Sequence, residues 1–305
     1  EEGFRQLALG NVQMPQRLAT TIPPHNGLHL SMPAFVDREP GTLTTKIITV
    51  YPDNPAKHIM PMIQGVLMLY DAENGKLLAL MDAEHLTAMR TGAASGVATK
   101  ALAKPDASFV TLFGAGAQAG AQLAAVCAVR PVERAFVVTK TGRHDVAFCL
   151  HMEAKLGIEV TPAEDPRAAV ESSDIICTAT TSFVPVVNGN WVQDGTHINA
   201  VGAYTSSMRE LDSSTVQFAR VFVDDHQGAK TEAGDILIPI EAGEIGYDHV
   251  VGELGDVLLE RLPGRRHETD ITIFKSVGLA MQDAVTAEKV YARAIEEDVG
   301  QDVEL

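Results

Sequence analysis

The chain has 305 residues, 46% of them apolar and 21% charged, an ordinary globular composition that excludes intrinsic disorder. Its formal net charge of −16 repels phosphate backbones and anionic membrane surfaces, so we expect neither nucleic acid nor a membrane as a partner. An anionic substrate would need a local group of cations to overcome this charge. The length favours two domains.

The three cysteines, Cys127, Cys149 and Cys177, lie among apolar neighbours and match no zinc or redox spacing. We interpret them as buried small hydrophobic residues and expect no metal site. An odd, scattered set of thiols fits a reducing compartment, and neither a signal peptide nor a membrane-spanning run is visible. The sequence therefore predicts a cytoplasmic protein.

The first hundred residues predict a helix end, a sheet and a helix, in that order. Residues 1–10 resemble the end of a helix, and residues 43–81 are rich in β-branched and apolar residues. Asn74-Gly75 joins two short apolar runs, which predicts a hairpin. Residues 87–103 are rich in alanine, with apolar positions at helical spacing.

From residue 104 onward the pattern alternates between strand and helix. We expect strands at residues 108–113, 135–139, 158–161, 174–178, 197–201 and 220–223, and helices at 118–129, 143–156 and 166–172. A last strand at 271–274 precedes a helix from 277 to about 297. These strands are short and apolar on both faces, as a covered parallel sheet requires. The pattern predicts an α/β fold with a doubly wound parallel sheet of the Rossmann type.

A glycine motif marks the first of these strand-to-helix turns. An apolar strand runs into FGAGAQA (residues 113–119), and an alanine-rich helix follows. Gly114 permits a tight turn, and Gly116 lets the backbone approach a pyrophosphate. Ala117 and Gln118 open the helix, whose unpaired N–H groups face the phosphates. The motif in this setting predicts dinucleotide binding, and the alternative is a glycine-rich turn without a ligand.

The end of the second strand bears on the choice of cofactor. It carries Thr139, Lys140, Thr141 and Arg143, with no acidic residue to accept hydrogen bonds from the ribose of NAD. These residues suit a 2′-phosphate, so the sequence favours NADP(H), with NAD(H) as the alternative. The competing interpretation is a solvated basic turn.

Outside this segment, three cations are candidates for binding an anionic substrate: Arg17, Lys46 and Arg90. Each, taken alone, fits a surface charge. Lys46 fits that interpretation least well, because it lies inside the apolar strand sequence LTTKIITV. A lysine in such a place needs an anionic partner or a lowered pKa.

Segments along nearly the whole chain carry a family resemblance. They are MPQR (14–17), SMPA (31–34), TTKIITVYPDN (44–54), LLALMDAEHLTAMRTGAAS (77–95), FGAGAQA (113–119), GTHINAVGA (195–203), REL (209–211) and DITIFKSVGLAMQD (270–283). Through them the chain resembles the ornithine cyclodeaminase and mu-crystallin family. That family includes ketimine reductases and archaeal alanine dehydrogenases.

The resemblance implies a homodimer with two domains per chain. A smaller α+β substrate and dimerisation domain would comprise residues 1–103 and 277–305, and residues 104–276 would form the Rossmann domain. Arg17, Lys46 and Arg90 would surround the substrate carboxylate. The remaining implied cofactor contacts are Arg90 and Thr91 near the pyrophosphate, Thr178, Ala179 and Thr180 after the fourth strand, and Val201, Gly202 and Ser276 beside the nicotinamide.

Two positions depart from the cyclodeaminase pattern. Leu30 stands where those enzymes carry an acidic residue that contacts the substrate. Tyr204 stands where they and the archaeal alanine dehydrogenase carry an aspartate. A tyrosine donates a hydrogen bond but is a poor partner for a substrate ammonium. Both changes remove negative charge, which favours reduction of an imine.

The leading hypothesis is therefore NAD(P)H-dependent reduction of a C=N bond next to a carboxylate, by a ketimine or imino-acid reductase or an amino-acid dehydrogenase. Lys46 would protonate the imine nitrogen, with Tyr204 or a bound water as equal alternatives. The alternatives are an ammonia-releasing, NAD-dependent ornithine cyclodeaminase and a non-catalytic, crystallin-like binder of NADP or a small ligand.

Several other polar residues are assigned no chemistry. His85, His197 and His226 have no partner spacing and are interpreted as structural or surface residues. Asp224-Asp225 lacks a complementary set of metal ligands. The segment around Lys230 and Asp235 is expected to be a loop with local ion pairs.

Overall fold

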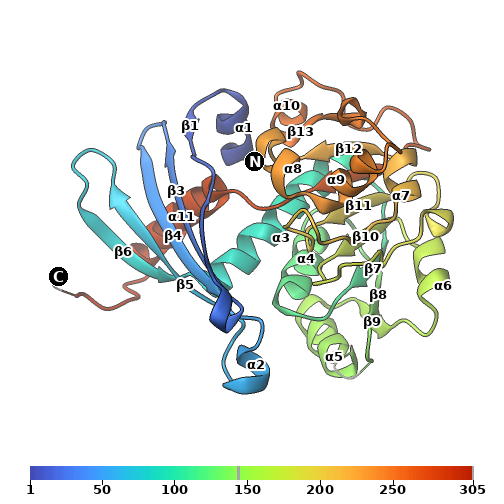
Figure 1. Ribbon diagram of the computed structural model, residues 1–305, viewed down its shortest axis with the longest axis horizontal. Helices are drawn as coiled ribbons and strands as arrows, with labels where there is room; N and C mark the ends of the chain where they lie inside the picture. The colour runs from blue at the N-terminus through green and yellow to red at the C-terminus, as the bar shows by residue number, and fades with distance from the viewer. Residues whose placement is uncertain (143–144, 304–305) are drawn as a thin grey trace. The chain divides into compact units, whose positions relative to one another are not determined.

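A computed structural model describes residues 1–142 and 145–303 of the chain. The chain divides into two compact units, drawn in Figure 1. The antiparallel-sheet unit comprises Glu2–Arg90 and Leu279–Leu305, and the parallel-sheet unit comprises Glu1 and Thr91–Gly278. The first boundary falls inside helix α3 (Ala83–Leu102), whereas the sequence analysis placed it after residue 103. The second falls two residues beyond the expected position.

The antiparallel-sheet unit has its strands in the order β1-β3-β4-β5-β6, with β2 pairing with β3. Its strands are β1 (Val12–Gln13), β2 (Leu18–Ile22), β3 (Gly27–Val36), β4 (Thr42–Val50), β5 (Ile63–Asp71) and β6 (Leu77–Asp82). Its helices are α1 (Glu2–Ala8), α2 (Asn54–Lys57), the first part of α3, and α11 (Ala280–Glu296). The chain thus returns at its C-terminal end to complete a unit that its first residues began.

Helix α11 covers one face of this sheet and contacts β3, β4 and β5 (Figure 1). Buried and half-buried residues alternate strictly along β4, as the two-residue period of a strand requires. Lys46 is in phase with the buried Ile48 and Val50, so its side chain faces the covering helix. The alternation therefore places a lysine at a core position.

The parallel-sheet unit holds eight strands in the order β13-β12-β14-β11-β10-β7-β8-β9, and every pairing is parallel. The strands are β7 (Phe109–Phe113), β8 (Arg134–Val138), β9 (Glu159–Pro162), β10 (Ile175–Thr178), β11 (His197–Ala200), β12 (Arg220–Val223), β13 (Val250–Glu253) and β14 (Thr272–Lys275). The strand order reverses between β7 and β10. At such a switch point the carboxyl ends of the strands leave a crevice, which is where open α/β sheets bind ligands.

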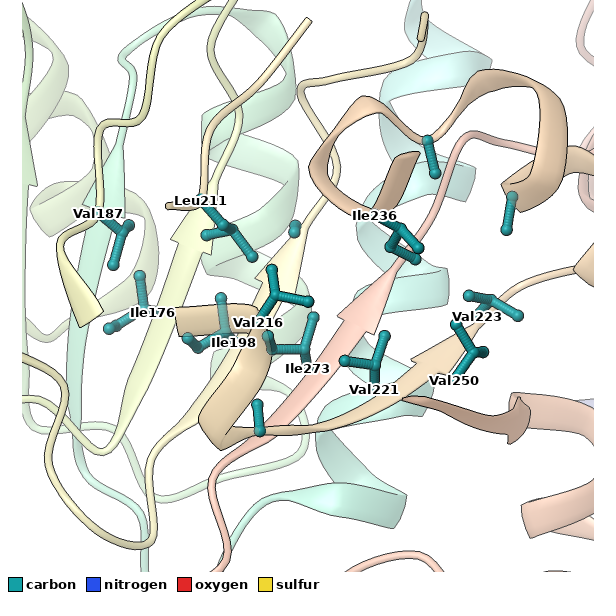
Figure 2. Packing of buried hydrophobic residues seen from close by; sticks show 14 of the residues in the cluster. Ile176, Val187, Ile198, Leu211, Val216, Val221, Val223, Ile236, Val250 and Ile273 are labelled. Carbon is teal, nitrogen blue, oxygen red and sulfur yellow. The ribbon is translucent and has the colours of Figure 1, made fainter. Parts of the chain in front are cut away.

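The helices of this unit cover its sheet. Besides the second part of α3 they are α4 (Ala117–Cys127), α5 (Asp145–Leu156), α6 (Pro166–Glu171), α7 (Ser213–Phe218), α8 (His226–Glu232), α9 (Gly234–Glu241) and α10 (Leu254–Leu258). Figure 2 shows the core formed by β10, β11, β14 and β12 with the helices that cover them. Ile198 and Ile273 on neighbouring strands meet Val216 of α7, and Ile236 of α9 belongs to the same cluster. Each such side chain contributes roughly 1.5–3 kcal/mol when fully buried.

The expected fold class and most expected elements are confirmed, with some corrections. Strands β2 and β3 precede residue 43, where the sequence analysis began the sheet, and β13 was not foreseen. The loop expected around Lys230 and Asp235 is wrong, because both residues lie in helices, α8 and α9. Within the described residues, no helix is long and apolar enough to cross a membrane, and no cluster of potential ligands could hold a metal ion.

Candidate functional site

The glycine turn after β7 has the shape that a dinucleotide needs. Gly114 has a φ of 108°, and a Cβ there would lie 2.7 Å from the carbonyl oxygen of Ala179. Gly116 is the N-cap of α4 and has no side-chain cap. A Cβ on Gly116 would meet no atom within 4 Å, and both Gly116 and Ala117 are exposed. The first backbone N–H groups of α4 thus face open space, as a bound pyrophosphate requires.

Gln118, the next residue of the motif, supplies a further sign of a ligand. Its Oε1 atom is buried and has no hydrogen-bond partner among the described residues. A buried polar atom without a partner costs free energy, and a ligand or water that accepts or donates the missing hydrogen bond removes that cost. The residues present therefore fit a dinucleotide at this turn.

The turn after β8 offers less to a 2′-phosphate than its sequence indicated. The hydroxyl of Thr139 donates to the Asp145 carboxylate at 2.6 Å and accepts from the backbone N–H of Gly142 at 3.1 Å. An acidic residue, Asp145, therefore stands beside this strand end after all. Lys140 and Thr141 are exposed, and Arg143 lies outside the described residues.

The loops after β10 and β11 contain most of the residues expected near the nicotinamide. The hydroxyls of Thr178 and Thr180 both donate to Glu210, at 2.8 Å each, and so point into the unit. Ala179, Val201 and Gly202, the residues that directly follow these strand ends, are half-buried.

Ser276 follows β14, and its hydroxyl donates to Asp224 at 2.7 Å. The same Asp224 oxygen accepts from the backbone N–H groups of Val277 and Gly278, both at 2.9 Å. Asp224 is 1% exposed, and burial raises its pKa. Its role is therefore to hold residues 276–278 in place.

The antiparallel-sheet unit contains a buried cluster of two cations and one carboxylate. Lys46 Nζ lies 2.7 Å from one Asp283 oxygen, and Arg90 Nε donates to the other at 2.9 Å. Arg90 Nη1 also donates to Gln282 Oε1 at 2.5 Å, and Lys46 Nζ lies 3.5 Å from the Thr87 hydroxyl. Lys46 and Asp283 are at most 1% exposed, and Arg90 is 6% exposed.

The electrostatics of this cluster act on Lys46. Burial and the positive charge of Arg90 lower the pKa of Lys46 from 10.5 to about 8. The Asp283 carboxylate opposes that shift, and Arg17 adds to it. Lys46 has both features that its sequence position required, an anionic partner and a lowered pKa. A pKa near 8 suits a residue that gives and takes a proton near neutral pH.

The remaining expected site residues are placed as follows. Arg17 is half-buried and close enough to Lys46 to lower its pKa, so the three expected cations belong to one electrostatic group. Thr91 begins the long segment Thr91–Gly278 of the parallel-sheet unit and is 8% exposed. Tyr204 follows β11 and is half-buried.

Sequence reasoning missed the acidic member of the cluster. Asp283 lies in the first turn of α11, where an acidic side chain favours helix formation. It is also the last residue of the matching segment DITIFKSVGLAMQD. Sequence spacing did not pair it with Lys46, because 237 positions separate them. Gln282, the second partner of Arg90, was missed for the same reason.

The three histidines that the sequence analysis considered, all among the described residues, show no acid–base geometry. His197 is fully buried and contacts Thr272 and Asn199, at 2.9 and 3.2 Å. Burial lowers its pKa to about 3, so it is neutral at physiological pH. His226 contacts the Tyr247 hydroxyl at 3.2 Å, and His85 is exposed.

Comparisons with known proteins identify the family of this chain. The model of the "Ornithine cyclodeaminase/mu-crystallin family" matches residues 1–298. A Δ1-pyrroline-2-carboxylate reductase from Bacillus cereus is 39% identical over 264 residues, which cover 86% of this chain and 80% of that protein.

Two solved structures are similar over nearly the whole chain. One is a Thermococcus litoralis Δ1-pyrroline-2-carboxylate reductase in complex with NADH and L-proline, with a TM-score of 0.95 and 42% identity. The match covers 99% of this chain and 93% of that one. The other is an archaeal alanine dehydrogenase dimer with bound NAD, with a TM-score of 0.92 and 34% identity, covering 100% and 92% of the two chains.

Proposed function

This chain belongs to the ornithine cyclodeaminase/mu-crystallin family, and we propose that it is a nicotinamide-dependent reductase of cyclic imines that carry a carboxylate, with Δ1-pyrroline-2-carboxylate as the first candidate. The observation that carries the proposal is the buried cluster around Lys46. Lys46 and Arg90 share the Asp283 carboxylate there, and Arg17 lies close enough to act on Lys46, which leaves an excess of positive charge for an anionic substrate.

The dinucleotide would be held by the glycine turn and the strand ends described above. The pyrophosphate would lie at Gly114, Gly116 and the N-terminus of α4. The loops that contain Ala179 and Val201–Gly202, together with Ser276, would border the nicotinamide. When bound, the reduced cofactor supplies the hydride that adds to the imine carbon.

The residues of the antiparallel-sheet unit would bind and protonate the substrate. Arg17 and Arg90 orient its carboxylate, and orientation of this kind removes part of the entropic barrier. Lys46 Nζ donates a proton to the imine nitrogen as that nitrogen becomes an amine, and then regains a proton from solvent. Asp283 keeps the Lys46 ammonium in place between turnovers. Tyr204 or a bound water is the alternative proton donor.

The distribution of acidic residues favours an imine over a diamino acid such as ornithine. The second ammonium of ornithine would need a carboxylate partner. Leu30 is 4% exposed in the apolar core of the sheet and supplies none. Asp283 is already paired with Lys46 and Arg90.

The test is a substrate panel followed by absorbance of reduced nicotinamide and by ammonia release. We expect Δ1-pyrroline-2-carboxylate to drive NADH or NADPH oxidation with proline as product. Pyruvate with ammonium tests the alanine dehydrogenase reaction. Ornithine with NAD⁺ that releases ammonia without net change in cofactor would overturn the proposal in favour of a cyclodeaminase. If the protein turns over none of the compounds in the panel, the result favours a ligand-binding protein.

Three finer points belong to the same proposal. NADP(H) preference rests on Lys140, Thr141 and Arg143, whereas Asp145 beside Thr139 opposes a second phosphate. The ratio of kcat/KM for NADPH and NADH decides between them. We also expect a homodimer located in the cytoplasm, as light scattering and cell fractionation can test.

A further inference from the structure

A fully buried carboxylate, Glu210, contacts the two loops that are expected to border the nicotinamide. Its Oε2 atom accepts from the Thr178 hydroxyl at 2.8 Å and from the N–H groups of Gly202 and Ala203 at 2.8 and 3.2 Å. Its Oε1 atom accepts from the N–H and the hydroxyl of Thr180, at 2.7 and 2.8 Å. One side chain therefore joins the loop after β10 to the loop after β11.

Two further buried charges hold Glu210 in place. Asp235 Oδ1 accepts from the backbone N–H groups of Glu210 and Leu211, at 2.7 and 2.9 Å. Lys275 Nζ lies 2.9 Å from Asp235 Oδ2 and donates to the carbonyl oxygen of Ala203 at 2.5 Å. Glu210 has no measurable exposure, and Asp235 and Lys275 are each 1% exposed. The three charges tie the ends of β10, β11 and β14 to helix α9.

The packing leaves little freedom around this carboxylate. A Cβ at Gly202 would lie 2.3 Å from Glu210 Oε1 and 2.3 Å from the carbonyl oxygen of Thr180. Three of the five donors to Glu210 are backbone N–H groups, which can only donate, so the geometry fits an ionised carboxylate. Burial and the nearby Asp235 raise the pKa of Glu210, whereas Lys275 and the Thr180 donors lower it.

From this arrangement we infer that Glu210, supported by Asp235 and Lys275, is a positioning residue. It fixes the loops after β10 and β11 in the positions that orient the nicotinamide ring for hydride transfer. The inference rests on the proposed function. It assigns the hydroxyls of Thr178 and Thr180 to Glu210 instead of to the cofactor. The glycine turn that would bind the pyrophosphate makes none of these contacts, so the two halves of the cofactor depend on different residues.

The test is Glu210→Gln, which keeps the shape of the side chain but turns an NH₂ group toward backbone donors. Affinities for NADH and for ADP-ribose, which lacks the nicotinamide, are measured together with kcat. We expect kcat to fall by about 10–100-fold, because small misplacements of reacting groups have effects of this size. NADH affinity should fall several-fold, while ADP-ribose affinity stays within about twofold, since the glycine turn is intact.

Asp212→Asn is the matched control. Asp212 also accepts backbone N–H groups in the same unit, from Gly189 and Thr215, but it caps α7 and shares none of the donors that Glu210 uses. The control should leave kcat and the ratio of NADH to ADP-ribose affinity unchanged. If Glu210→Gln does the same and only lowers the melting temperature, Glu210 is structural and the inference is overturned.

Thr178→Val keeps the test decisive if Glu210→Gln does not fold. It removes one hydroxyl donor from Glu210 at constant shape, and it should produce the same pattern at smaller size, about a fivefold loss of kcat, the effect of one lost hydrogen bond. Wild-type kcat and affinity with Thr178→Val would overturn the inference. The wild-type enzyme separates the two proposals: without turnover of any imine the proposed function fails, whereas turnover with unchanged variants refutes only the positioning role.

Discussion

Two lysines of this chain, Lys46 and Lys275, are buried to the same extent and have different surroundings. Each is 1% exposed and lies beside an aspartate, at 2.7 and 2.9 Å. Lys46 shares Asp283 with Arg90 and is also close to Arg17, so its cluster has an excess of cations. Lys275 has two carboxylates within its network, and its ammonium donates a hydrogen bond to a carbonyl oxygen.

The comparison shows that a buried lysine–aspartate pair can serve two purposes, depending on its surroundings. Around Lys275, the N–H and hydroxyl donors that surround Glu210 offset its additional negative charge, so the network holds backbone segments in fixed positions. A buried pair with an excess of one charge attracts a ligand of the other charge and shifts the pKa of its own members. Removing one lysine or the other should therefore affect different properties of the protein.

Lys46→Met should give the largest effect. Loss of the proton donor is expected to lower kcat by about 10²–10⁴-fold, the usual contribution of general acid catalysis. Cofactor affinity should change little, because the glycine turn lies in the other unit. Steady-state kinetics and cofactor titration measure both quantities. Lys76→Met, an exposed residue in the β5–β6 turn, is the control. Near-normal turnover of Lys46→Met would remove Lys46 from the mechanism.

Lys275→Met should act mainly on stability. It leaves Asp235 and Glu210 buried with one cation fewer, and breaking a buried pair in this way typically costs about 3–5 kcal/mol. Denaturant unfolding measures the loss. A loss below about 1 kcal/mol, the value for an exposed pair, would contradict the comparison between the two lysines.

The pH dependence of the reductive reaction should follow the ammonium of Lys46. Because the acid form is required, kcat/KM should be constant below pH 8 and fall about tenfold per unit above it. Asp283→Asn should move this limb to lower pH, because the carboxylate raises the pKa of Lys46. The reverse reaction needs the neutral amine, so its rate should rise through the same pH. A limb at the same pH in wild type and Asp283→Asn would assign the proton to another group.

Arg17→Met should give the smallest change in the pH profile, and the limb should move in the direction opposite to that expected for Asp283→Asn. Arg17 lowers the pKa of Lys46, so its removal should move the limb to higher pH. Loss of a charged contact to the substrate carboxylate should raise KM by about tenfold or more, with kcat less affected. An unchanged KM would exclude Arg17 from the substrate site.

Sequence patterns placed most strands of the parallel-sheet unit within one or two residues of their observed bounds, because short apolar runs between helical stretches allow few alternatives. They did not find β13, whose four residues include Gly252. They also did not find α7 to α10, which have only five to eight residues each. The N-terminal strands were missed where proline and polar residues interrupt the pattern in β2 and β3.

For the candidate site, the sequence alone identified the glycine turn and the unusual position of Lys46, because local backbone sterics and strand alternation act over a few residues. Only the tertiary structure supplied Asp283 for Lys46 and joined Glu210 to Thr178 and Gly202. Pairing of buried charges depends on which distant segments pack together, and nothing in the spacing of residues along a chain encodes that contact.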